Sequence, residues 1–390
     1  MAALVAPQKT STDTKRAERV GRAEAAGAVT VPGRYNRPVE VTVPGTYAVG
    51  VVFGTAVVAL VATAAMDPQT PAPAGLTSVA GVKVGHHTLA ERPTGCTVIL
   101  VEPAAVAAID VRGAAPGTVE TDLLRPDMLV GSVNAIFLSG GSAFGLDTRA
   151  GIMRYLEEQK IGFRYGGAYV PIVTGAIIFD LNVGGAPTVR PGPDCGYRAA
   201  AAASAGPVAE GSVGAGAGAT VGKFGGAGRA MKGGVGSTAL SSAGGLVVAA
   251  LVVVNASGSV VDPRTGKPVA GVRTADGKAL EDPFALVRRG AAPAGAGENT
   301  TIGVVATNAR LTKAQASRVA AMAHDGLARA IVPSHTMSDG DALYALATGA
   351  VDAEVNRVGV LAAEAVTEAI LRAVRAATGL PGFPAASDIR

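Results

Sequence analysis

Apolar residues in the last third of the chain alternate between the spacing of a buried strand and the spacing of a helix. Residues 301–307 form an apolar, β-branched run, which predicts a strand. Thr312 and Gln315 make a capping box, which predicts that a helix begins there. A second strand pattern covers residues 342–347, and apolar residues then recur at helical spacing over residues 358–374. The order strand, helix, strand, helix predicts a layer of helices packed on a sheet.

The middle of the chain adds further strands and one helix. Compact apolar runs bounded by turn residues predict buried strands at residues 96–100, 106–111, 135–138 and 244–254. The third run leads through Gly141 and Ser142 into a helical pattern over residues 146–160. The amino end of such a helix carries unpaired N–H groups that can hold an anion or a carbonyl oxygen. Gly141 and Ser142 are therefore candidate substrate-binding residues.

Residues 211–236 are rich in glycine and alanine. Gly214, Gly216 and Ala219 resemble a dinucleotide-binding fingerprint, but no strong strand pattern leads into them. A phosphate loop also fails, since the glycine spacing is one residue short and Phe224 stands where a serine or threonine is needed. We expect close backbone packing near a site here rather than nucleotide binding.

The first 75 residues differ in character from the rest. Residues 1–45 are polar, basic and interrupted by proline, which predicts a disordered arm. Residues 46–66 carry no charge over about the length of a membrane-spanning helix, and a proline-rich linker, residues 67–75, follows. A membrane anchor, a cleaved signal peptide, a buried strand pair or a true start at Met66 all fit this pattern. The location of the main body, cytoplasmic or membrane-anchored, stays open.

Composition narrows the classes of protein. Of the 390 residues, 48% are hydrophobic and 16% charged, and much of the net charge of +4 comes from the amino-terminal arm. No basic face with interleaved aromatic residues appears later, which argues against nucleic acid as a partner. Cys96 and Cys195 give neither a metal-binding spacing nor a disulfide framework, which fits a reducing compartment. We predict no metal and no cofactor.

The candidate chemistry lies where a long polar segment meets a strand. Residues 262–298 have the composition of a loop, and the strand pattern begins directly after Asn299. Cleavage between Asn299 and Thr300 would place a hydroxyl nucleophile and a free α-amine on one residue. Such an amine has a reference pKa of about 7.7–8.0 and is a recognised base for its own threonine hydroxyl. Asn299 and Thr300 are therefore either a polar entry to the strand or a cleavage site, and in the second case Thr300 is the nucleophile.

Two aspartates and one asparagine are candidates to assist Thr300. Asp339 and Asp341 form either a solvated turn or a pair of carboxylates that orient the threonine ammonium or hydroxyl. Asn255 either closes a turn or donates to the oxyanion of a tetrahedral intermediate.

The histidines allow a competing arrangement, a serine triad of Ser142 with His324 or His335 and one of the two aspartates. The nucleophile elbow of such enzymes has glycine two residues after the serine, and Phe144 stands there. We therefore expect the four histidines of the chain to lie in turns or helix caps.

A series of short blocks, in order, carries a resemblance to a known family. The blocks are Gly81–His86, Gly95–Val98, Arg112–Thr118 with Glu120–Leu124, Leu138–Leu146, Gly211–Gly216, Met231–Gly234, Val254–Ala256, Asn299–Thr301 and Asp339–Asp341. Together they resemble the self-cleaving D-aminopeptidase/β-peptidyl aminopeptidase family, also called the L-aminopeptidase/D-esterase family. The resemblance spans about residues 76–379.

The resemblance implies an α/β fold, a four-layered αββα sandwich of the N-terminal-nucleophile type that ornithine acetyltransferases share. It also implies self-cleavage into a large chain, residues 76–299, and a small chain, residues 300–390, whose pairs associate into a homo-oligomer. The implied activity removes amino-terminal residues from small peptides, amides or esters without a metal.

The same resemblance assigns roles to four residues. Thr300 matches the family's nucleophile, which is usually serine, and Asn255 matches its oxyanion-side asparagine. Asp339 and Asp341 match a serine and a glutamate that assist the nucleophile.

The chain also departs from the family pattern. Ala114 replaces a common glycine, Asp339 puts a carboxylate in place of a hydroxyl, and the substrate-side tyrosine falls near Ile177 or Ile178. Two alternatives to the aminopeptidase-like hydrolase therefore stay open. One is an acyltransferase of the ornithine acetyltransferase type, and the other is a non-enzymatic binding protein on the same scaffold.

Overall fold

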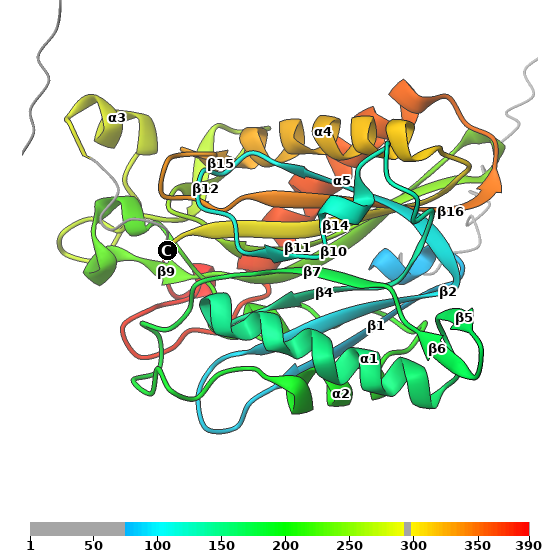
Figure 1. Ribbon diagram of the computed structural model, residues 1–390. Coiled ribbons are helices and arrows are strands. Elements are labelled where there is room, and N and C mark those ends of the chain that lie inside the picture. The colour runs from blue at the N-terminus through cyan, green and yellow to red at the C-terminus, as the bar shows by residue number, and fades with distance from the viewer. Residues whose placement is uncertain (1–74, 292–297, 390) are drawn as a thin grey trace, which may run out of the picture. The chain divides into compact units, whose positions relative to one another are not determined.

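The computed structural model describes residues 75–291 and 298–389 (Figure 1). The predicted arm, residues 1–45, the apolar segment, residues 46–66, and all but the last residue of the linker lie outside this part, so their assignments stay predictions. Among the described residues, no helix combines the length and the apolar character that a membrane span requires.

The described residues are built around one large set of hydrogen-bonded strands. Their order is β10 (Gly234–Ser242), β11 (Leu246–Asn255), β14 (Thr300–Ala309), β16 (Ala342–Val351), β2 (Gly95–Val111), β4 (Val133–Ser139), β7 (Val173–Ile177) and β3 (Thr118–Val119), with β1 (Val82–Thr88) on β2. The first half of β2 pairs with β1 and β4, and its second half pairs with β16. The long strand β2 therefore passes from one sheet layer to the other.

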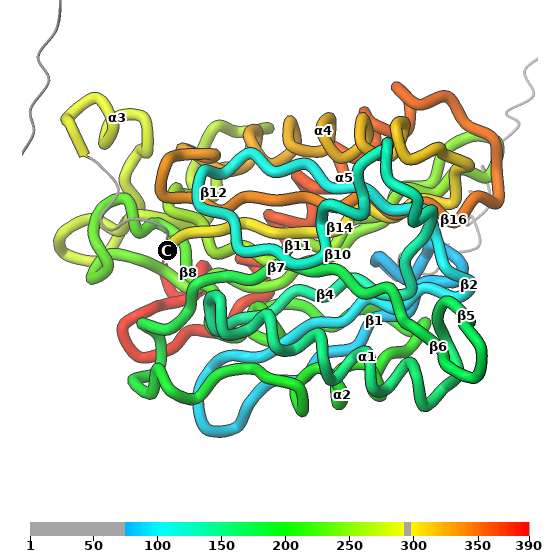
Figure 2. Tube along the Cα trace, in the orientation of Figure 1, coloured from blue at the N-terminus to red at the C-terminus, as the bar shows by residue number. Residues whose placement is uncertain are grey.

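Helices cover both outer faces of the two sheets (Figures 1 and 2). α1 (Thr148–Glu158) and α2 (Pro193–Ala201) enclose one buried cluster with β2 and β4, whereas α4 (Lys313–Ala330) and α5 (Val355–Arg375) enclose another with β11, β14 and β16. A third cluster fills the space between the two sheets. The order of layers is helix, sheet, sheet, helix, which confirms the predicted αββα sandwich.

Strand β11 shows how the sequence produces two cores at once. Its side chains alternate between the two faces of the sheet, as the period of a strand requires. Val248 and Val252 lie in the core under α4 and α5, and Leu251 and Val253 lie in the core between the sheets. Because both faces are buried, the strand is apolar without interruption over most of its length. This explains the long apolar run that predicted it.

Smaller elements complete the described part of the chain. They are β5 (Phe163–Tyr165), β6 (Ala168–Val170), β8 (Thr220–Val221), β9 (Met231–Lys232), β12 (Ser259–Asp262), β13 (Lys267–Ala270), β15 (Ile331–Val332) and α3 (Pro283–Arg288). The predicted loop over residues 262–298 was thus partly wrong, because β13 and α3 lie inside it. α3 forms because Pro283 occupies its first position and the Asp282 carboxylate accepts hydrogen bonds from the next two amides.

Two other predictions need correction. The separate strands predicted at residues 96–100 and 106–111 are one continuous strand, β2. Cys96 and Cys195 are joined by a disulfide, with their Cα atoms 6.3 Å apart. The prediction of no disulfide was wrong because the pairing depends on α2 packing against the start of β2, across 99 residues of sequence.

The glycine-rich segment packs as tightly as predicted. A Cβ atom on Gly216 would lie 2.4 Å from the backbone nitrogen of Val235, and one on Gly218 would lie 2.5 Å from the Asp180 carboxylate. Buried Lys232 donates to the carbonyls of Gly216 and of two further residues, and desolvation lowers its pKa to about 7. The glycines are therefore required by close backbone approach.

Candidate active site

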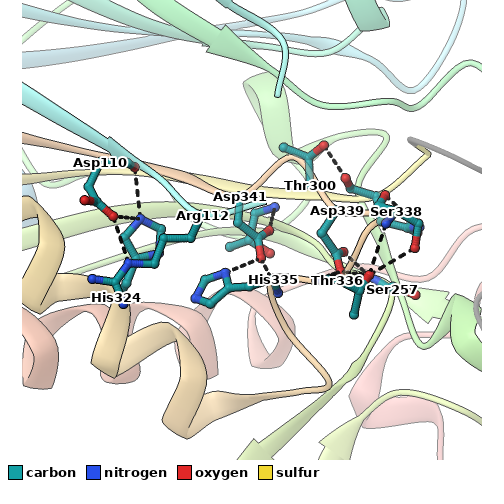
Figure 3. A network of polar contacts seen from close by, with 12 residues as sticks. Asp110, Arg112, Ser257, Thr300, His324, His335, Thr336, Ser338, Asp339 and Asp341 are labelled. Atoms are coloured by element: carbon teal, nitrogen blue, oxygen red, sulfur yellow. Dashed lines mark hydrogen bonds and ion pairs between the residues drawn. The ribbon is translucent and has the colours of Figure 1, made fainter. Parts of the chain in front are cut away.

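The predicted catalytic residues converge where β11, β14 and β16 begin or end (Figure 3). Thr300 is the first residue of β14 and pairs with Asn255, the last residue of β11. β14 and β16 are parallel, so their starts lie at the same edge of the sheet. Asn299 forms a parallel bridge with Asp339, in the turn that leads into β16. Asn299, Thr300, Asn255, Asp339 and Asp341 are each no more than 3% exposed.

The peptide bond between Asn299 and Thr300 lies in a polarising environment. Its carbonyl oxygen, on Asn299, accepts a hydrogen bond from the Thr300 hydroxyl at 2.5 Å and one from the Gly340 amide at 2.8 Å. The Asn299 amide itself donates to the Ser338 carbonyl. The predicted nucleophile and a backbone amide thus both donate to the carbonyl oxygen of the predicted cleavage site.

Glycine is needed at position 340. A Cβ atom there would lie 2.5 Å from the Ala115 carbonyl oxygen and 2.9 Å from the Thr300 hydroxyl oxygen. The loop carrying Ala115 is held against the turn, since the Ala115 amide donates to the Asp339 carbonyl and the amides of Arg112 and Gly113 donate to the Asp341 carbonyl. The block of sequence around residues 112–118 is therefore bonded directly to the Asp339–Asp341 turn.

The Asp339 carboxylate is buried, and its two oxygens accept different numbers of hydrogen bonds. One oxygen accepts from the Ser257 amide at 3.4 Å, and the other accepts from the amide and the hydroxyl of Thr336 at 3.0 and 2.5 Å. Desolvation raises the pKa of Asp339, and the nearby Asp341 charge raises it further. Hydrogen bonds from Thr336 and Ser257 act in the opposite direction. A buried carboxyl group with a raised pKa can take part in proton transfer.

Asp341 bridges the strand that begins with Thr300 and the turn before β16. One of its carboxylate oxygens accepts from the Thr301 amide at 2.7 Å. The other accepts from both the amide and the ring Nδ1 of His335, at 3.0 and 2.9 Å. The solvated turn considered for Asp339 and Asp341 is therefore wrong, because both side chains are buried and accept hydrogen bonds from backbone amides.

The histidines lie in places that the sequence did not fully predict. His335 occupies the predicted turn, but His324 lies on the buried face of α4, and His86 and His87 lie in β1. The His324 Nε2 atom is 3.0 Å from the Asp110 carbonyl, and burial lowers the pKa of His324 to about 4. Among the described residues, no hydrogen bond joins Ser142 to either His324 or His335, so a serine triad finds no support.

Asn255 is held on both sides of its amide. Its Oδ1 accepts from the Thr220 amide and from the Lys223 ammonium, each at 3.0 Å, and its Nδ2 donates to the Phe179 carbonyl at 3.0 Å. Nδ2 carries two hydrogens, and this contact uses one of them. The amide orientation is thus fixed before any substrate arrives.

Lys223 belongs to this site and was missed as a functional residue by sequence reasoning, which considered it only as part of a phosphate loop. Its ammonium donates to the Asn255 carbonyl as well as to the Asn255 side chain, and to the Glu298 carbonyl at 3.3 Å. Burial lowers its pKa to about 7, although the charges of Asp339, Glu298 and Asp180 act against that shift. Lys223 is the one charged residue between Glu210 and Arg229, and this was the available signal.

The predicted substrate-binding pair, Gly141 and Ser142, has its backbone amides already engaged. The Gly141 amide donates to the Asp180 carboxylate at 2.9 Å, and the Ser142 amide donates to the Ile178 carbonyl at 3.0 Å. Asp180 is also in a fully buried ion pair with Arg92. The expectation of unpaired N–H groups was therefore wrong for these two residues, and the Ser142 side chain is what remains for a ligand.

Comparison with known proteins places the chain in a family. The chain is 42% identical over 344 residues to an uncharacterised aminopeptidase of Mycobacterium tuberculosis, covering 80% of this chain and 97% of that one. It is 30% identical over 313 residues to the 6-aminohexanoate-oligomer endohydrolase of Paenarthrobacter ureafaciens, covering 75% and 84%.

Solved structures give the same picture. A β-aminopeptidase of a Burkholderia species superposes with a TM-score of 0.58 at 26% identity, covering 78% of this chain and 86% of that one. The L-aminopeptidase D-Ala-esterase/amidase of Ochrobactrum anthropi shares the fold, with a TM-score of 0.60 at 20% identity over 80% of this chain and 90% of that one. The profile of peptidase family S58 matches residues 74–387. The protein is therefore a hydrolase that belongs to peptidase family S58.

Proposed function

We propose that the protein is a self-cleaving, threonine-type aminopeptidase-like hydrolase, with Thr300 as the nucleophile in both maturation and turnover. The observation that carries this proposal is the contact of the Thr300 hydroxyl with the carbonyl of the peptide bond before it, together with the Gly340 amide on the same carbonyl oxygen. Among relatives, several are named aminopeptidases and a structural neighbour is a β-aminopeptidase, which supports the activity class.

Maturation follows from this arrangement. The Thr300 hydroxyl oxygen adds to the Asn299 carbonyl carbon, and its proton passes to a neighbouring base. The Gly340 amide stabilises the oxyanion that forms. Breakage of the carbon–nitrogen bond, with a proton delivered to the nitrogen, leaves Asn299 esterified to the threonine oxygen and releases the α-amine of Thr300. Water then hydrolyses the ester and frees the hydroxyl.

Turnover uses the same atoms on a substrate. The free α-amine of Thr300 accepts the hydroxyl proton, and the oxygen attacks the substrate carbonyl. The amine or alcohol portion then leaves with that proton as an acyl-enzyme forms, and water hydrolyses the acyl-enzyme to release the acid and restore the hydroxyl. Asn255 contributes its free Nδ2 hydrogen to the oxyanion, and Asp339 and Asp341 orient Thr300. We place the Ser142 side chain on the substrate side. The cleaved chain pairs associate as a homo-oligomer in this proposal.

The substitution of Thr300 by valine tests the nucleophile with little change in shape. Valine is also β-branched and suits the first position of a strand. The Asn299 carbonyl keeps the Gly340 amide as a partner, so we expect a folded, uncut chain. Thr300→Ser keeps the hydroxyl and removes one buried methyl, which costs roughly 1 kcal/mol of stability, and should still cleave.

The measurement is the intact mass of the purified proteins. The wild type and Thr300→Ser should give two fragments, the smaller beginning at Thr300, and Thr300→Val should give one. A wild-type chain that stays intact while hydrolysing aminoacyl esters would overturn the proposal. Adding ornithine as an acceptor during turnover separates hydrolysis from acyl transfer. Acyl transfer requires the ornithine amine to react with the acyl-enzyme faster than water does.

A further inference from the structure

We propose that His335 is a positioning residue for the nucleophile, acting through the Asp341 carboxylate. This inference rests on the proposed function, since it concerns the same threonine. The His335 backbone amide and ring Nδ1 both donate to one oxygen of Asp341, and the second oxygen of that carboxylate accepts from the Thr301 amide (Figure 3). His335 therefore fixes the carboxylate that holds the residue directly after Thr300.

The backbone at His335 supports a dedicated role. Its φ is 57°, in the left-handed region that side chains other than glycine, asparagine and aspartate adopt at a cost. This conformation lets the amide and the ring of one residue reach the same carboxylate oxygen. Strained residues of this kind persist where the surrounding structure holds them, and they gather at functional sites.

The hydrogen-bond pattern determines which ring nitrogen carries the proton. An ionised carboxylate only accepts hydrogen bonds, so Nδ1 of His335 must be the donor to Asp341. On the other side, the His324 ring packs edge-on against the His335 ring, with centroids 4.9 Å apart. His324 is itself fixed by its contact with the Asp110 carbonyl. Packing against the His324 ring thus holds the His335 ring in the orientation that directs Nδ1 toward Asp341.

The competing explanation is that His335 only closes the turn, since Thr336 and Asp339 already form hydrogen bonds within the same turn. The two explanations differ in what asparagine and glycine should do at position 335. Both residues tolerate a positive φ, but only asparagine presents an N–H close to the place of Nδ1. Loop closure by the backbone amide is available to both, and donation by the side chain only to His335→Asn.

The experiment compares the self-cleavage rates of the purified wild type, His335→Asn and His335→Gly, with melting temperatures measured in parallel on precursors made uncleavable by Thr300→Val. Loss of one hydrogen bond to a charged group predicts a roughly 10- to 100-fold slower cleavage for His335→Gly. The self-cleavage rate of His335→Asn should stay within about threefold of the wild-type rate. A small loss is expected because the asparagine side-chain amide reproduces the geometry of the imidazole ring incompletely. Lys160→Gly is the matched control, because Lys160 is exposed and has a φ of 60° outside the site.

Equal rates for His335→Gly and the wild type would overturn the inference, and so would equal losses in the asparagine and glycine variants. If His335→Gly does not fold, His335→Gln replaces it, because its amide lies one methylene beyond the Nδ1 position. On the matured enzymes, a fall in kcat with KM unchanged for an aminoacyl p-nitroanilide supports positioning, and a rise in KM alone contradicts it. Failure of the wild type itself to cleave would count against the Thr300 proposal, separately from the comparison of variants.

Discussion

The buried amine of Lys223 should make the stability of this protein depend on pH in a way that one substitution removes. In the folded state its pKa is lowered from 10.5 to about 7, chiefly by desolvation. Between these two values the unfolded chain holds a proton on this group that the folded chain does not. The free energy of unfolding therefore rises with pH across this window. The contribution of Lys223 to that free energy is lost as the pH falls through the pKa of Lys223 in the folded state.

The size of the effect follows from the two pKa values. Raising the pH from about 7 to about 9 should add roughly 2 kcal/mol to the unfolding free energy through Lys223 alone. Lys232, whose pKa is also lowered to about 7, adds a similar increment. Lys223→Met abolishes the first increment. The hydrogen bonds that it loses to Asn255 and Glu298 shift stability by an amount that varies little with pH, so the difference between the two pH values isolates the titration.

The assay is urea denaturation at the two pH values, carried out in the Thr300→Val background so that a single continuous chain unfolds. Lys223→Met should show about 2 kcal/mol less stabilisation from pH 7 to pH 9 than its parent. Lys267→Met, at an exposed lysine of strand β13, should match the parent. An unchanged pH dependence in Lys223→Met would refute the reasoning, since the amine would then be solvated in the folded state.

Two further predictions concern Gly340 and the buried ion pair of Arg92 with Asp180. Gly340→Ala places a methyl group 2.9 Å from the Thr300 hydroxyl oxygen. Self-cleavage, followed on a denaturing gel, should therefore slow roughly 10- to 100-fold. Cleavage at the wild-type rate would show that the turn moves to accommodate the methyl group without loss of rate. Arg92→Met leaves Asp180 buried without its ion-pair partner and should cost roughly 3–5 kcal/mol in urea denaturation. The exposed pair made by Arg125 offers a comparison, since Arg125→Met should cost at most about 1 kcal/mol; equal losses would contradict the argument from burial.

Local sequence signals predicted the carboxyl-terminal third well because its elements are long and periodic. α4 begins at the capping box of Thr312 and Gln315 as expected, and both side-chain contacts of that box are present. α3 was missed because a six-residue helix shows no apolar period, and its start depends on the Asp282 cap alone. Short elements that are stabilised by a cap and by tertiary contacts leave little trace in hydrophobic patterns.

The sequence singled out Thr300 and the two aspartates as candidates, and the structure brings them to one edge of the sheet, but no sequence pattern indicated the residues that hold them. Lys223 contacts Asn255, and His335 contacts Asp341. Asn255 is distant from Lys223 in sequence, and the two become neighbours only in the folded chain. The disulfide of Cys96 was missed for the same reason. Residue type and spacing can suggest a reactive group, but burial and the orientation of its partners are tertiary properties.

The pairing of β14 with the turn before β16 explains why two aspartates flank a glycine. Next to a neighbouring strand, alternate side chains of an extended segment point the same way, whereas the residue between them offers its backbone. Asp339 and Asp341 accordingly bond to the Ser257 and Thr301 amides, and Gly340 donates its own amide to the carbonyl before Thr300. A slip of one residue in this register would turn both carboxylates away and remove the oxyanion donor in the same step. Correct strand pairing is thus a condition for the proposed cleavage, so the chain cannot mature before its sheet has formed.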